Sequence, residues 1–144
     1  MMHTRKTLLL SLLLVGFISC SKDEGNNTVP NEFPPVKPEI QYYVKYDVKM
    51  NMLRKKGNRT ILFKTPKGDE RVTYNFVYGT TTWNGTFGPF KSGDEVYLNC
   101  TMETDGVIES SISVSEDGKP FVVKRHGELS YSDNCRLSYT LGNP

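Results

Sequence analysis

Side chains with acid–base or nucleophilic chemistry are sparse in this sequence. Beyond His3 there is one histidine, His126, close to the end of a predicted strand, where a histidine is usually a surface residue. The motifs Gly-x-Ser-x-Gly, His-Glu-x-x-His and Cys-x-x-Cys do not occur, and neither does a phosphate-binding loop. One histidine together with Cys100 and Cys135 cannot supply the three or four ligands of a transition-metal site. We therefore predict no catalytic residues, no metal site and no cofactor.

Acidic residues are frequent enough to form pairs that could bind calcium or hydrolyse a glycosidic bond. Those in the second half of the chain are Asp94, Glu95, Glu103, Asp105, Glu109, Glu116 and Asp117. Most stand beside glycine in turn-like stretches, where aspartate favours the backbone geometry of a turn. We expect structural turns here, and a carboxylate-dependent hydrolase is kept as an alternative.

The N-terminus has the pattern of an export signal. His3, Arg5 and Lys6 form a short basic region, and Leu8 to Ile18 is an uncharged run. A bilayer-spanning helix needs about 20 apolar residues, so this run is too short to cross a membrane. We predict that residues 1–19 are a signal peptide.

The residues that follow suggest a lipid anchor. Phe17-Ile18-Ser19-Cys20 resembles the lipobox of bacterial lipoproteins, although Phe17 replaces the usual leucine. The resemblance implies that Cys20 becomes the first residue of the mature protein and carries the lipid, which anchors the domain without a span. Ser21-Lys22-Asp23-Glu24 resembles the signal that sends lipoproteins of the Bacteroidota to the outer cell surface. The expected location is the outer membrane, with exposure at the cell surface.

Lipidation of Cys20 also accounts for an odd cysteine count. The chain has three cysteines, so Cys100 and Cys135 remain as an even pair in an oxidising compartment. We expect a disulfide between them. Two free thiols, or a reactive cysteine paired with His126, are the alternatives.

The stretch that follows Cys20 is expected to be a tether. Residues 20–39 contain four prolines and few apolar residues, which is typical of a semi-rigid linker. Without residues 1–19 the 144-residue chain loses Arg5 and Lys6, so its formal charge falls from +2 to zero. The remaining residues 40–144 suit a single domain.

A period of two runs through the rest of the chain. From Ile40 to Met50 apolar residues alternate with polar ones, as in a half-buried antiparallel strand. Asn84-Gly85 is a strong hairpin signal, and turn signals recur about every ten residues. We predict an all-β domain: an antiparallel β-sandwich of the immunoglobulin-like type, with seven to nine strands.

Positive charge is concentrated early in this domain. Residues 45–67 contain eight lysines and arginines but one acidic residue, Asp47. Lys55, Lys56 and Arg59 could form a patch for an anionic partner, whereas solvated strand faces are the simpler interpretation. Nucleic acid is not an expected partner of a surface-anchored protein.

Two aromatic residues could also contact a partner. Tyr43 lies on the face opposite the inward set, and Trp83 flanks the predicted hairpin turn. Such side chains can stack on sugar rings or anchor a protein. A core pair of Trp83 with Phe87 or Phe90 is the other interpretation.

The stretch from Val72 to Tyr139 resembles a known family. It contains Gly88-Pro89-Phe90, a Lys-Ser-Gly-Asp turn, Val-x-Leu-x-Cys and Ile-x-Val-x-x-Asp-Gly in that order. This arrangement looks like the extracytoplasmic domain of the mycobacterial small membrane protein family, and is similar to small β-sandwich lipoproteins of the Bacteroidota. The resemblance implies an antiparallel sandwich with a disulfide, in accessories of lipid and siderophore exporters. It brings no catalytic residues, and here a lipobox replaces the family's transmembrane anchor.

Ser110 and Ser111 also stand where that family has its first cysteine, and Cys100 lies one strand earlier. Together these features predict a non-catalytic binding or accessory module, attached to the membrane through its N-terminal lipid and facing an unknown protein or glycan. The first alternative is a glycan-binding module that uses Trp83 and nearby tyrosines.

Overall fold

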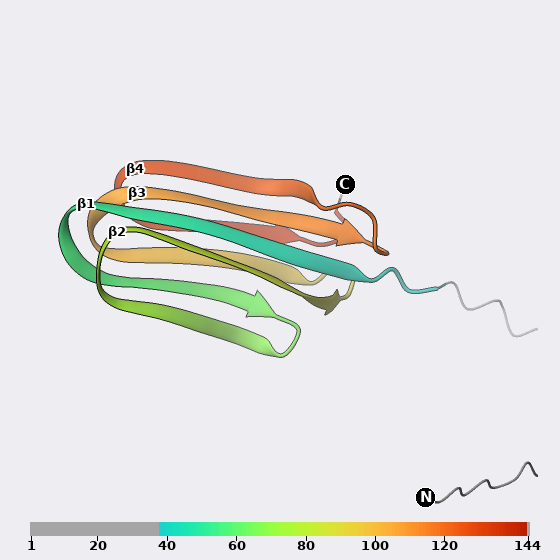
Figure 1. Ribbon diagram of the computed structural model, residues 1–144. Helices are drawn as coiled ribbons and strands as arrows, with labels where there is room; N and C mark the ends of the chain where they lie inside the picture. Colours follow the sequence, from blue (N-terminus) through green and yellow to red (C-terminus); the bar gives the residue numbers. More distant parts are fainter. Residues whose placement is uncertain (1–37, 144) are drawn as a thin grey trace, which may run out of the picture. The chain divides into compact units, whose positions relative to one another are not determined.

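The computed structural model describes residues 38–143, and within them the chain is all-β. Its strands are β1 (Tyr42–Thr65), β2 (Gly68–Phe90), β3 (Glu95–Glu116) and β4 (Val122–Thr140). They pair antiparallel in the order β2-β1-β3-β4 (Figure 1). The predicted all-β, antiparallel class is confirmed. The predicted signal peptide, Cys20 and nearly all of the tether lie outside the described residues.

Each strand is long and bends in its middle. Figure 1 shows all four strands turning back at the same end, so that the two halves of each strand lie in facing layers. The register of β1 with β2 shifts between Met52 and Gly57, and the register of β3 with β4 shifts between Thr101 and Gly106. Gly79 of β2 and Tyr131 of β4 have positive φ angles of 76° and 56°. Segments that the sequence suggested as separate short strands are therefore halves of longer, bent ones.

The predicted hairpin at Asn84-Gly85 is wrong. Both residues lie inside β2, opposite Asp47 and Tyr46 of β1. Gly85 does not have the positive φ that a hairpin turn would require. A Cβ atom added to Gly85 would lie 2.7 Å from the Phe87 ring, so the glycine makes room for aromatic packing instead.

The core fills the space between the two layers. The inward set that alternates from Tyr42 to Met50 is buried as predicted, whereas Ile40 at its start is exposed. The largest fully buried apolar residues of the whole core are Tyr46, Phe63, Met50, Met52, Ile61, Leu98, Ile108, Ile112 and Leu141. Tyr46, Phe63, Phe87 and Trp83 form an aromatic cluster with ring centroids 4.6–6.0 Å apart. This packing holds the two halves of β1 and β2 against each other.

Cys100 and Cys135 are directly opposite each other on β3 and β4, and both are buried. The structure contains them as free thiols, so the predicted disulfide is not formed in it. Burial, together with the neighbouring Cys135, raises the pKa of the Cys100 thiol to about 12. The register thus brings the predicted pair together, and the bridge itself stays a prediction.

Candidate functional site

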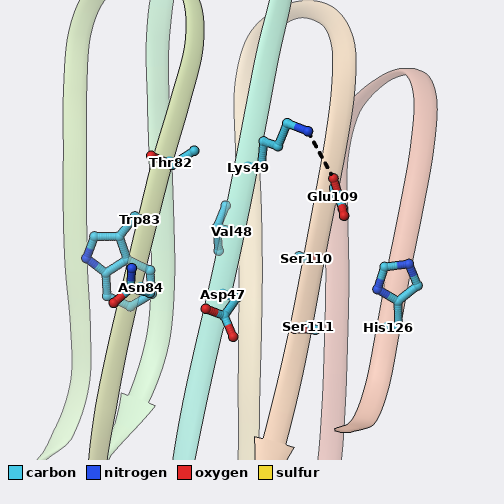
Figure 2. Close-up of a pocket in the computed structure, with 10 residues that line it drawn as sticks. All are labelled: Asp47, Val48, Lys49, Thr82, Trp83, Asn84, Glu109, Ser110, Ser111 and His126. Carbon is cyan, nitrogen blue, oxygen red and sulfur yellow. Dashed lines mark hydrogen bonds and ion pairs between the residues drawn. The ribbon is translucent and has the colours of Figure 1, made fainter.

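A shallow depression of about 290 Å³ lies on the outward face of the layer formed by the first half of β1 and its neighbours. All four strands contribute to it, and Figure 2 shows the side chains that line it. On β1 the residues that face outward are the polar members of the alternating pattern, such as Asp47 and Lys49. The same period that buries Tyr46 and Val48 therefore presents a polar outer surface.

Four polar residues form a continuous line across this face. Asn84 of β2 is opposite Asp47 of β1, and Asp47 is opposite Ser111 of β3. Ser111 is in turn opposite His126 of β4. We call this line the polar row: Asn84, Asp47, Ser111 and His126. Neighbouring strands are about 4.8 Å apart, so the row extends over roughly 14 Å.

Two ion pairs neutralise the charges around the row. Lys49 Nζ lies 3.4 Å from Glu109 Oε2, and this pair bridges β1 and β3 at one end of the depression (Figure 2). Lys45 Nζ lies 3.0 Å from Asp47 Oδ1. Because each lysine has a carboxylate partner, the depression presents polar groups with little net charge.

The row does not have the geometry of a serine hydrolase. A catalytic triad needs the histidine between the serine and the carboxylate. Here Ser111 lies between Asp47 and His126, so the histidine and the carboxylate are separated by the width of β3. Among the side chains that the structure describes, no three of histidine, cysteine, aspartate or glutamate are grouped so that they could hold a metal ion.

Trp83 and Tyr43, the two aromatic residues predicted to contact a partner, lie in different parts of the fold. Trp83 borders the depression, but it is opposite the buried Val48, so its half-buried indole lies on the core side of the sheet. It therefore belongs to the core, as one interpretation expected, but its ring contact is with Phe63, with centroids 4.6 Å apart, and not with Phe87 or Phe90. Tyr43 lies on the outward face but packs beside Gly88, where an added Cβ would be 2.5 Å from its ring, and it does not line the depression.

Arg59 cannot belong to the predicted anionic-partner patch, because its side chain is 0% exposed. Its guanidinium donates hydrogen bonds to the carbonyl oxygens of Met50 and Gly79 and to the Thr81 hydroxyl. Burial lowers the pKa of this guanidinium. Lys56 is exposed at the bend, and the side chain of Lys55 lies outside the described part of the structure.

The rest of the basic stretch is also dispersed. Lys45 and Lys49 face outward from one layer, whereas Lys64 belongs to the half of β1 in the other layer and lies 3.1 Å from Asp69. Since β1 is an inner strand that bends, its lysines do not gather on one surface. The charge concentrated in the sequence is thus distributed over two faces in the fold.

Asp47, Asn84 and Ser111 were not predicted to share one site. Asp47 and Ser111 are outward residues of alternating strands, but Asn84 was expected in a hairpin turn, and the alignment of all three depends on registers between strands distant in sequence. No match to the chain was found among protein-family models, curated proteins or solved structures. Within residues 38–143 there is no helix of the length and apolarity that a membrane span requires.

Proposed function

We propose that this chain is a lipid-anchored, non-catalytic binding module of the cell envelope, and that the depression is its ligand surface. The observation that carries the proposal is the polar row, which crosses all four strands within one depression. A rigid sheet holds these side chains in place, so they bind without the cost of ordering a loop. The lipobox-like residues up to Cys20 support the anchored location.

A hydrolase is less well supported by this surface. Asp47 and Glu109 share the depression, as a pair of glycosidase carboxylates would. However, a general acid needs surroundings that keep one carboxyl protonated. Both carboxylates instead have lysine partners, and their side chains are 39% and 47% exposed. Exposed carboxylates that form ion pairs suit binding better than acid catalysis.

The anchoring part of the proposal can be tested on cells that produce the full chain. Intact-mass measurement of the membrane fraction should find a chain that begins at a lipidated Cys20. The variant Cys20→Ser should not be retained in the outer membrane, whereas Cys135→Ser should be. A mature membrane-bound protein that still begins at Met1 would contradict lipidation.

The binding part needs a variant that blocks the depression. Ser111→Arg places a long side chain in the middle of the polar row, and Asn75→Arg makes a similar change at an exposed position on the other half of β2. We expect Ser111→Arg to abolish binding of purified envelope polysaccharide, peptidoglycan fragments or envelope peptides, and Asn75→Arg to keep it. Equal binding by both variants would refute this surface.

A further inference from the structure

We propose that the ligand of the depression is an uncharged, linear oligosaccharide that lies across the strands along the polar row. This inference rests on the binding role proposed above and names its ligand class. Two features of the described residues support it: the neutral charge of the face and the spacing of the row.

The charge of the face favours a ligand that is polar but uncharged. Lys49 is paired with Glu109 and Lys45 with Asp47, so neither sign dominates. An anionic ligand would meet the Asp47 and Glu109 carboxylates, and a cationic ligand would meet the two ammonium groups. Sugar hydroxyls both donate and accept hydrogen bonds, and so they match a surface of carboxylate, amide, hydroxyl and imidazole groups.

The spacing of the row suits a repeating ligand. Its four side chains recur at the distance between strands, about 4.8 Å. The repeat of a linear pyranose chain is similar in length, so successive sugar units could each face one strand. The residues that line the depression come from all four strands, so a ligand along the row would cross each strand in turn (Figure 2).

Trp83 lies at the β2 end of the row, but its side chain is on the core side of the sheet, because it is opposite the buried Val48 and its indole packs on Phe63. Its chain neighbours Thr82 and Asn84 line the depression, so the emission of Trp83 reports on a ligand bound there. The other lining residues offer little apolar area, and Val48 is 4% exposed, so a hydrophobic peptide side chain would find no pocket here.

The test uses the fluorescence of Trp83, which is the one tryptophan in the chain. The full chain is kept in a detergent without sugar groups and titrated with uncharged linear hexasaccharides of different linkage, and with an oligogalacturonate as the anionic comparison. We expect at least one uncharged hexasaccharide to change the Trp83 emission in a saturable way. Added salt should alter its affinity little, because no net charge is involved.

Variants then locate the site. Asn84→Ala and His126→Ala should each weaken hexasaccharide binding about tenfold, the loss of one good hydrogen bond. Asn75→Ala is the matched control for Asn84→Ala, since both are exposed asparagines of β2, and it should bind as the unchanged chain does. Isothermal calorimetry provides a second measurement in case a variant alters the fluorescence itself.

The possible failures are distinguishable. Tight binding of the oligogalacturonate alone, or of envelope peptides in a manner blocked by Ser111→Arg, would overturn the oligosaccharide inference and leave the binding module intact. If Asn84→Ala and Asn75→Ala weakened hexasaccharide binding equally, the sugar would not bind at the polar row. If no envelope component bound to the unchanged chain, both proposals would fail.

Discussion

The Arg59 guanidinium donates a hydrogen bond to the carbonyl oxygen of Met50 over 3.1 Å, and thereby joins the two halves of β1 across its bend. The same guanidinium donates to Gly79 and Thr81 of β2. A buried cation therefore serves the bend of the sheet by supplying donors to carbonyl groups beside the break in the ladder.

Replacing Arg59 should destabilise the domain. Arg59→Ala leaves a space in the core and removes the donors from these carbonyl groups, so we expect the free energy of unfolding to fall by about 3 kcal/mol. Urea unfolding followed by Trp83 fluorescence measures this change. Lys56→Ala, at an exposed position of the same bend, should change stability by less than about 0.5 kcal/mol. Equal effects of the two variants would contradict the role of Arg59.

Asn58 should stabilise the bend through two neighbouring strands. Its side-chain oxygen accepts a hydrogen bond from the Phe76 amide of β2 at 3.0 Å, and its backbone amide donates to Glu103 of β3 at 3.0 Å. Asn58→Ala removes the first bond and also the bond that the Asn58 side-chain amide donates to Glu103, which together should cost about 2 kcal/mol and accelerate hydrogen exchange of the Phe76 amide. Asn75→Ala is the control. Unchanged exchange at Phe76 would show that this bond does not protect the bend.

Asp69 is expected to make the stability depend on pH in the acid range. Hydrogen bonds from the side chains of Tyr97 and Lys64 hold the pKa of the Asp69 carboxyl below its usual range. Because the folded pKa lies below the unfolded one, its stabilisation is present above the unfolded pKa and is lost as pH falls through the folded pKa. Tyr97→Phe should raise the pKa of Asp69, measured by carboxyl NMR titration. Tyr139→Phe should leave the pKa of Asp69 unchanged. If the pKa of Asp69 were the same in Tyr97→Phe as in the original chain, the Tyr97 hydroxyl would not be the cause of the lowered pKa.

The pair of buried cysteines predicts a specific result in mass spectrometry. With Cys100 opposite Cys135, we expect protein isolated from the envelope without reductant to lack two hydrogens and to gain them on reduction. On the chain-entropy model the bridge would stabilise the domain by roughly 3–4 kcal/mol. Cys135→Ser supplies the control because it cannot form the bridge. If both thiols were alkylated after unfolding without a reductant, the two cysteines would be a reduced pair. The Cys100 thiol of such a pair stays protonated at neutral pH because its pKa is about 12.

The fold class could be predicted well because strand alternation is a local property. From Tyr42 to Met50 each inward residue is apolar and each outward one polar or amphipathic, and the structure buries that same set. The turn signals were less informative. Asn84-Gly85 matches a hairpin turn in composition, but the packing of Phe87 and Trp83 around Gly85 keeps the chain extended there.

Charge was the feature that the sequence alone described least well. A run of lysines and arginines suggested one basic surface, but the bend of β1 sends Lys49 and Lys64 to different layers and draws Arg59 into the core. The direction of a side chain depends on the strand period, which is a local property of the sequence. The neighbours of each side chain depend on how β1 pairs with β2 and β3, and these strands are distant in the sequence.

The amino-acid sequence by itself determined that this domain is built of antiparallel strands, and which residues of the first half of β1 face the core, because hydrophobic burial with a period of two leaves few other solutions. Only the tertiary structure decided that four strands bend into facing layers and that Asn84, Asp47, Ser111 and His126 form one row. Registers between strands follow from the packing of the whole core, and a shift of one residue would turn each of these side chains to the opposite face.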